Sequence, residues 1–126
     1  MRWLIDGNNV FGSRPDGWWN DRTAAMERFT QRVAEWCRTH ADQVTVVFDQ
    51  PVPESVLELA GGNLRVVAAQ RRGRDAADDE IARLADLAAE CGDELTVVTS
   101  DRGLRARLPV DVTAIGAGRF RALIGY

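Results

Sequence analysis

The sequence contains no lysine, a single histidine and only two cysteines among its 126 residues. One histidine and two cysteines are too few for a zinc site of the usual four ligands. The chain also lacks a P-loop, a cysteine–histidine nucleophile pair and a Gly-x-Ser-x-Gly turn, which excludes several common catalytic signatures. Because no apolar run approaches the ~20 residues of a membrane helix, we expect no membrane partner.

The composition is typical of a soluble globular protein. Hydrophobic residues make up 45% and charged residues 28% of the chain, and its length suits one domain with its own core. The first residues have the pattern of a strand that ends in an acid, not that of a signal peptide, which predicts a cytoplasmic location. Since no repeat or linker interrupts the chain, we interpret residues 1–126 as a single domain, and the sequence leaves its oligomeric state open.

All 16 basic residues are arginines, because lysine is absent. The guanidinium group is a planar fork suited to phosphate, so clusters of arginine are informative even at a net charge of −3. One cluster surrounds Gly73, another follows the acid at position 101, and a third lies near the C-terminus. From these clusters we take four candidate contacts to a phosphodiester backbone: Arg72, Arg74, Arg102 and Arg119.

Short β-branched or aromatic runs alternate with segments of helical periodicity. The runs predict strands over residues 2–6, 44–49, 64–68, 95–100 and 110–115. Helices are predicted from residue 20 or 21 to about 40, from 53 to 59, from 75 to 92 and from 101 to 109, whereas 7–20 and 116–126 are expected to be a loop and a tail. This alternation predicts an α/β fold with three layers, in which helices cover both faces of a mainly parallel sheet of about five strands.

Three of the predicted strands are followed directly by an aspartate, at Asp6, Asp49 and Asp101. Because the carboxyl ends of parallel strands share one edge of the sheet, we expect these acids to converge. Like charges repel, so a cluster of carboxylates needs a compensating cation, and carboxylate oxygens are ligands that Mg²⁺ and Mn²⁺ accept. The pattern therefore predicts a divalent-metal site at this edge.

These acids also have simpler interpretations. Asp6 starts Asp-Gly-Asn-Asn, which is typical of turns, but the next predicted helix begins more than ten residues later, and this disfavours a capping role. Asp101 can cap the short helix that follows it, and one residue can both cap a helix and bind a ligand. Asp49, which precedes a proline pair, is open to three roles: metal ligand, support of another acid, or solvated turn residue.

A further acidic run opens the helix predicted from Asp75. Capping by Asp75, together with acids in the first turn near the positive end of the helix dipole, explains most of the run. At ~100° per residue, however, Asp78 lies beside the apolar face that packs on the sheet, while Asp79 points away and is spaced to pair with Arg83 at i,i+4. We therefore predict that Asp78 reaches the acidic edge and that Asp79 does not.

Polar and aromatic residues near the acids have two interpretations each. Asn8, Asn9 and Ser100 are neutral oxygen donors that fit contacts to a ligand, a water or a phosphate, although turn chemistry explains both asparagines equally well. Trp18 and Trp19 stand together in a polar loop. They either stack on bases or pack over the first long helix, and packing is favoured for at least one of them.

The ordered set of motifs resembles the YacP-like NYN domain family, which belongs to the PIN-like superfamily of metal-dependent ribonucleases. The resemblance covers nearly the whole chain and rests on Ile5-Asp6-Gly7-Asn8-Asn9, Val47-Phe48-Asp49, Ala77-Asp78-Asp79-Glu80-Ile81, Thr99-Ser100-Asp101 and Gly116-Ala117-Gly118-Arg119-Phe120. It implies a PIN-like α/β/α fold and endonucleolytic RNA cleavage that depends on Mg²⁺ or Mn²⁺ and leaves a 5′-phosphate. Carried over residue by residue, it implies catalytic acids at Asp6, Asp78 and Asp101, with Asp49 as a fourth.

The sequence thus predicts a metal-dependent endoribonuclease in which Asp6, Asp78 and Asp101, with Asp49, hold the ion. The predicted substrate contacts are Asn8, Asn9, Ser100, Arg72, Arg74, Arg102 and Arg119. The expected partner is RNA, with ribosome-associated mRNA and structured RNA as candidates. The alternative is an inactive RNA- or ribosome-binding module of the same fold. A small-molecule phosphatase is disfavoured, because its nucleophilic aspartate is followed two residues later by an acid, whereas Asn8 stands there in this chain.

Overall fold

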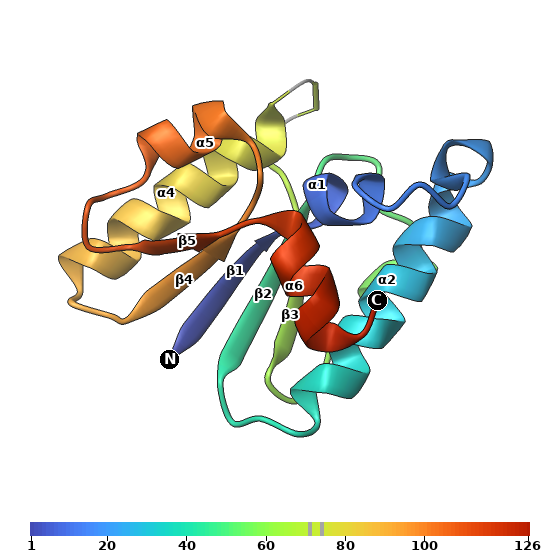
Figure 1. Cartoon of the computed structure of the whole chain (residues 1–126), viewed down its shortest axis with the longest axis horizontal. Helices are drawn as coiled ribbons and strands as arrows, with labels where there is room; N and C mark the ends of the chain where they lie inside the picture. The colour runs from blue at the N-terminus through green and yellow to red at the C-terminus, as the bar shows by residue number, and fades with distance from the viewer. Residues whose placement is uncertain (71, 74) are drawn as a thin grey trace.

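Five parallel strands form one sheet at the centre of the molecule (Figure 1). Their order is β3-β2-β1-β4-β5, with the bounds β1 Arg2–Asp6, β2 Gln43–Phe48, β3 Leu64–Ala68, β4 Leu95–Val98 and β5 Thr113–Ile115. The chain moves outward from β1 to β3 and then returns across the sheet to β4, so the winding reverses between β1 and β4. Open parallel sheets bind ligands at such a reversal, beyond the carboxyl ends of the strands. The predicted α/β class and parallel sheet are confirmed.

Helices cover both faces of this sheet. One face carries α1 Gly7–Gly12, α2 Arg22–Cys37, α3 Glu54–Leu57 and α6 Ala117–Ile124, and the other carries α4 Ala76–Glu90 and α5 Arg102–Arg107. The computed structural model describes residues 1–70, 72–73 and 75–126, so the predicted substrate contact Arg74 lies outside the described residues, as does Arg71. Within the described ranges, no helix combines the length and the apolar character needed to cross a membrane.

Successive side chains along each strand point to opposite faces of the sheet, so each face has its own hydrophobic core. Ile5 of β1 packs in the cluster on the α2 side, together with Phe29 and Phe48, whereas its neighbour Leu4 packs on the α4 side with Ile81. All five of these side chains are fully or almost fully buried. Because the central strands are covered on both faces, their sequences are continuous apolar runs, which made them recognisable in the sequence.

The remaining predicted elements agree with the structure to within a few residues. The Asp21 carboxylate caps α2, since its Oδ1 accepts a hydrogen bond of 3.0 Å from the Ala24 amide, as predicted. The last strand begins at Thr113 rather than at residue 110, because Val110 is 99% exposed and lies in the turn before it. The predicted strand over 95–100 ends at Val98, and the residues after it belong to the candidate site.

Two segments predicted as loop and tail are helical. Residues 7–20 contain the six-residue α1 and a short 3-10 helix, η1 Trp18–Asn20, and α6 occupies most of the tail. Both ends of α1 are glycine, which is a poor helix former, so its stability comes from burial of Val10 and Phe11 against the sheet. For α6 the spacing of its buried residues, Ala117, Phe120 and Ile124, was a helical signal in the sequence.

Candidate functional site

The structure gathers the four predicted acids at the carboxyl edge of the sheet. Asp6 is the last residue of β1, Asp49 follows β2, Asp101 precedes α5, and Asp78 lies in the first turn of α4. Figure 1 shows α1 and the starts of α4 and α5 at this same end of the strands. The four carboxylates interact electrostatically: charges on Asp78 and Asp49 raise the pKa of Asp6, and those on Asp101 and Asp49 raise the pKa of Asp78.

Asp6 is the most deeply buried of these acids, with 4% of its surface exposed. Burial is the largest cause that raises its pKa, from 3.8 to about 7, and the charges on Asp78 and Asp49 add to the effect. The Thr99 hydroxyl, which donates to Asp6 Oδ2 over 3.0 Å, and the backbone amide of Asn9 offset only part of the increase. Near neutral pH the protonated and ionised forms of this carboxyl group are therefore both populated.

Asp78 is half-buried, and its pKa is raised from 3.8 to about 6. Burial is the first cause, followed by the charges on Asp101, Asp75 and Asp49, while the Arg107 guanidinium lowers the pKa. Arg107 itself is engaged with Asp79, whose Oδ1 lies 2.8 Å from its Nη1. Among the described residues, negative charge at this edge is therefore only partly compensated.

The predicted i,i+4 pair between Asp79 and Arg83 is wrong. Arg83 instead binds Glu80 at i,i+3 through two hydrogen bonds, of 2.6 and 3.3 Å, and Asp79 binds Arg107 of α5. Glu80 is 8% exposed and its carboxylate lies where the Arg83 fork can bind it with both nitrogens. Asp78 and Asp79 nevertheless have different partners. The Asp79 carboxylate binds Arg107 of α5, whereas the Asp78 carboxylate interacts electrostatically with the other acids.

Two of the acids cap helices at this edge. Asp49 Oδ1 accepts a 2.8 Å hydrogen bond from the Ala77 amide and so caps α4 from the end of β2, and Asp101 Oδ1 accepts a 2.9 Å bond from the Leu104 amide of α5. Asp75, the predicted cap of α4, adopts a left-handed conformation with φ 64° and makes no capping bond with its side chain. A carboxylate offers about four acceptor positions, so both caps retain capacity for a further ligand.

The short helix α1 fixes the two flanks of the acidic edge. The side-chain oxygen of Asn8 accepts a 2.7 Å bond from the Asp49 amide, and that of Asn9 accepts a 2.8 Å bond from the Ser100 amide. The Ser100 hydroxyl in turn accepts a 2.8 Å bond from the Ala117 amide at the start of α6. These three predicted substrate contacts therefore position the backbone around the acids, and direct contact with a substrate stays a prediction for them.

Thr99 is a site residue that the sequence analysis missed. Its side chain is fully buried; the hydroxyl donates to Asp6 Oδ2 and accepts a 3.1 Å bond from the Asp101 amide. One hydroxyl thus connects the strand-end acid of β1 to the acid after β4. The only sequence signal is a hydroxyl residue two positions before Asp101, within the strand predicted over 95–100.

Replacement of Thr99 by valine is expected to weaken both the fold and the site. The partly buried Asp101 amide would lose its acceptor, at a cost of about 1–3 kcal/mol in the free energy of unfolding, and the pKa of Asp6 would rise further. Urea unfolding of Thr99→Val and Thr99→Ser compares loss of the hydroxyl with its retention. Equal stability of the two variants would show that the hydroxyl does not support the acids.

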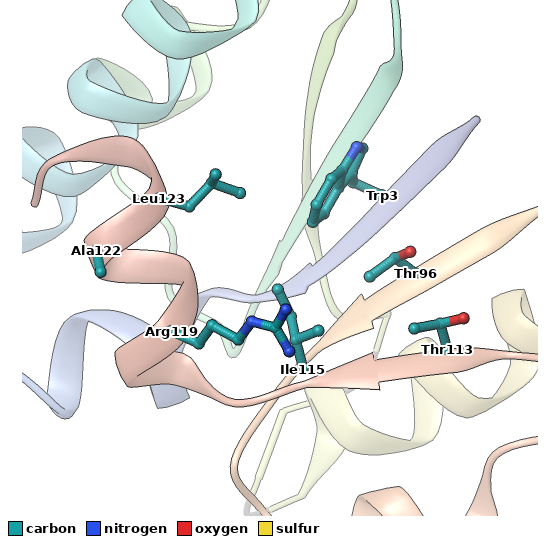
Figure 2. Close-up of a pocket in the computed structure, with 7 residues that line it drawn as sticks. All are labelled: Trp3, Thr96, Thr113, Ile115, Arg119, Ala122 and Leu123. Atoms are coloured by element: carbon teal, nitrogen blue, oxygen red, sulfur yellow. The ribbon is translucent and has the colours of Figure 1, made fainter.

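The predicted arginine contacts are spread over three places. Arg72 lies beyond β3 and donates to the Gln50 side chain over 3.3 Å, and Arg102 is exposed at the start of α5. Arg119 lines an open pocket of about 440 Å³ between α6 and the sheet, on the α2 side, where Figure 2 shows its guanidinium beside Ile115. The pocket wall is mostly apolar; its other lining residues are Trp3, Thr96, Thr113, Ala122 and Leu123. Arg119 is thus separated by the sheet from the α4 side, toward which Asp6 points.

The acids are not preassembled into a metal centre. In residues 1–70, 72–73 and 75–126, no group of three or more histidine, cysteine, aspartate or glutamate side chains has an arrangement that could hold an ion. The acidic edge is therefore a set of carboxylates that interact through their charges, two of them with raised pKa values.

Comparisons with known proteins identify the fold. No protein-family model and no curated protein matches the chain. Among solved structures, Rae1 (YacP) from Bacillus subtilis superposes with a TM-score of 0.76 and 20% sequence identity, and the match covers 99% of this chain and 74% of Rae1. The W164L mutant of Rae1 superposes with a TM-score of 0.77 and 22% identity, covering 98% of this chain and 74% of the mutant chain. T5 5′-exonuclease with bound zinc superposes with a TM-score of 0.55 and 15% identity, covering 92% of this chain and 55% of the exonuclease. T5 D15 protein co-crystallised with metal ions superposes with a TM-score of 0.58 and 13% identity, covering 91% of this chain and 53% of that protein. The resemblance to the YacP-like NYN family and the PIN-like fold that it implies are confirmed at the level of the fold.

Proposed function

We propose that this protein is a divalent-metal-dependent endoribonuclease. The observation that supports this function best is the convergence of Asp6, Asp49, Asp78 and Asp101 at the reversal of the sheet winding. An acid with a strongly raised pKa at such a position is uncommon in a purely structural role and marks a candidate site. The fold is shared with Rae1 (YacP) and with a T5 5′-exonuclease, which makes phosphodiester hydrolysis the natural chemistry for these acids.

The chemistry of the four acids, although not their arrangement in this structure, suits a hard divalent cation such as Mg²⁺ or Mn²⁺. All four candidate ligands are carboxylates, and burial, followed by the charges on neighbouring acids, raises the pKa of Asp6 and Asp78, an effect that a bound cation would oppose. Asp6, Asp78 and Asp101 would hold the ion, with Asp49 as a fourth ligand. Because Asp6 and Asp78 must be ionised to bind a metal, loading would release protons near neutral pH and strengthen as pH rises.

The side chains around the acids suggest how the reaction is organised. A divalent ion supplies activation of a water and polarisation of the scissile phosphate. Thr99 orients Asp6, the helix caps fix Asp49 and Asp101, and the asparagines of α1 hold both flanks of the edge. Among the described arginines near this edge, Arg72 and the exposed Arg102 could bind the phosphates on either side of the cleaved bond.

Cleavage of single-stranded RNA by the purified protein in the presence of Mn²⁺ tests the proposal. We expect cleavage products with 5′-phosphates, no cleavage in EDTA, and a thermal midpoint that rises with Mn²⁺ concentration, since an ion that binds only the folded state stabilises it. Parallel reactions with Mg²⁺ would identify the preferred ion. Cleavage that persists in EDTA would rule out a metal-dependent mechanism.

An inactive RNA- or ribosome-binding module of the same fold is the second candidate. It is favoured by one observation, the absence of a preassembled group of metal ligands in the described part of the chain. RNA binding that EDTA leaves unchanged, together with no cleavage in Mn²⁺ or Mg²⁺, would support this candidate over the nuclease.

A further inference from the structure

Trp19 is an aromatic side chain that the candidate site does not explain. Its surface is 61% exposed, whereas the other three tryptophans are half-buried. A single exposed apolar residue is ordinary on a protein surface. What distinguishes Trp19 is that the structure holds its large ring in a defined position at the surface.

A chain of aromatic contacts connects Trp19 to the core. Its ring packs edge-on against Trp18 with centroids 5.8 Å apart, Trp18 packs edge-on against Phe11 at 5.8 Å, and Phe11 lies 6.2 Å from the buried Phe48. The backbone on both sides is also fixed: the Asn20 amide donates to Gly17 and the Asp21 amide to Trp18 in η1. A ring ordered in this way loses little entropy when a ligand stacks on it.

The charges around Trp19 favour an anionic ligand. Asp16 lies between Arg14 and Arg28, at 3.7 and 3.9 Å, and the Asp21 carboxylate is used to cap α2. Arg22 follows directly and is exposed, and within the described residues the structure records no ion pair or hydrogen bond for its side chain. The three arginines thus outnumber the two acids, and both acids already have partners.

The surroundings fit a nucleotide better than a protein partner. Between Arg14 and Arg22 the two tryptophans are accompanied only by a proline, a glycine and polar residues, so this segment presents no further large apolar side chain beside Trp19. The core of a protein–protein interface is depleted in charge and densely packed with apolar side chains. An isolated ring beside arginine is instead the arrangement that stacks a base and contacts its phosphate.

The position of Trp19 relates it to the acids. Phe11, whose ring contacts Trp18, lies in α1. The two asparagines of α1 accept hydrogen bonds from the backbone that follows β2 and β4. In Figure 1 the segment after α1 leads to the start of α2 at the same end of the molecule as the starts of α4 and α5. A strand bound at the acids and extending past α1 would therefore meet Trp19.

We infer that Trp19 is a stacking platform for an unpaired base of a single-stranded RNA bound across the acidic edge, with Arg22 at the adjoining phosphate. This inference rests on RNA being the substrate of the proposed function, but not on its cleavage. Trp19 is a positioning residue: it holds the strand and does not touch the reacting phosphate.

Binding measured in EDTA separates stacking from catalysis. The probes are a fluorescein-labelled oligoadenylate of about 12 nucleotides, within the ~4–16 of single-strand sites, and an abasic strand of the same length. Trp19→Ala is expected to weaken binding of oligoadenylate by about 5- to 150-fold, the equivalent of ~1–3 kcal/mol of stacking, and to leave the abasic strand unaffected. Trp19→Phe should retain most of the affinity for oligoadenylate, and Arg22→Ala should weaken the binding of both strands.

Leu123→Ala is the matched control, because Leu123 is likewise a large exposed apolar residue, at 52%, and lies on α6 and not in the chain of aromatic rings. The inference is overturned if Trp19→Ala binds oligoadenylate as tightly as the unaltered protein, a result that would favour a protein as the partner of Trp19. It is also overturned if Leu123→Ala loses as much affinity for oligoadenylate as Trp19→Ala. Failure of the protein to cleave RNA in Mn²⁺ would remove the proposed nuclease activity without touching this result.

Discussion

Asp6→Asn is expected to abolish RNA cleavage and, at the same time, to stabilise the metal-free protein at pH 8. The asparagine oxygen can still accept the hydrogen bond from Thr99, so the shape of the site is retained. What disappears is a buried negative charge next to Asp78 and Asp49. Because this carboxylate is the proposed central metal ligand, the loss of cleavage should exceed the ~10- to 100-fold effect of removing an outer-shell partner.

The sign of the stability effect follows from the raised pKa of Asp6. Between its ordinary value of 3.8 and about 7, the folded state retains a proton that the unfolded state has released. Stability therefore falls as pH rises through this window, by on the order of 4 kcal/mol once the pH exceeds 7. Asp6→Asn removes this dependence, so its advantage should be large at pH 8 and absent below about pH 4.

Urea unfolding in EDTA across pH 4 to 8 measures this effect, with RNA cleavage in Mn²⁺ as the second readout. Asp111→Asn is the matched control, because Asp111 is exposed and the same chemical change there should alter neither quantity. An Asp6→Asn protein that cleaves RNA at the original rate would exclude Asp6 as a ligand. An Asp6→Asn protein that is no more stable than the unaltered protein at pH 8 would show that the negative charge of Asp6 is already balanced in the metal-free protein.

Gly7→Ala is expected to destabilise the protein by about 1–3 kcal/mol. A Cβ at Gly7 would lie 2.6 Å from Cδ1 of Phe48 and closer still to Cε1, well inside van der Waals contact. Phe48 is fully buried between Phe11 and Phe29, so its ring has little room to move. Either the ring or α1 must shift, and a shift of α1 would disturb the hydrogen bond that the Asn8 side chain accepts from the Asp49 amide.

Gly118→Ala is the control for this substitution, because a Cβ at Gly118 would meet no atom within 4 Å. Alanine is the better helix former, so the control should be neutral or stabilised by up to about 1 kcal/mol. Urea unfolding of both variants and their cleavage of RNA provide the comparison. Equal stability of Gly7→Ala and Gly118→Ala would mean that the contact between α1 and β2 is looser than the structure shows.

The strands and the acidic edge could be predicted from the sequence because their signals are local. A strand covered on both faces must be a continuous apolar run, and the residue after such a run in a parallel sheet must lie at the common edge. Asp6, Asp49 and Asp101 followed from that rule alone. Helical periodicity added Asp78, because its angle to the buried face of α4 depends only on its position in the sequence.

The tertiary structure alone decided how those acids are supported. Thr99 donates to an acid 93 positions away, and Asp49 caps a helix that begins 27 residues after it, in place of the predicted Asp75. The helix α1 exists because its apolar side chains are buried, although its own sequence favours a turn. Sequence patterns determine which residues reach an edge, but hydrogen bonds and burial between distant segments determine which of them are fixed, which are desolvated, and hence which carry a raised pKa.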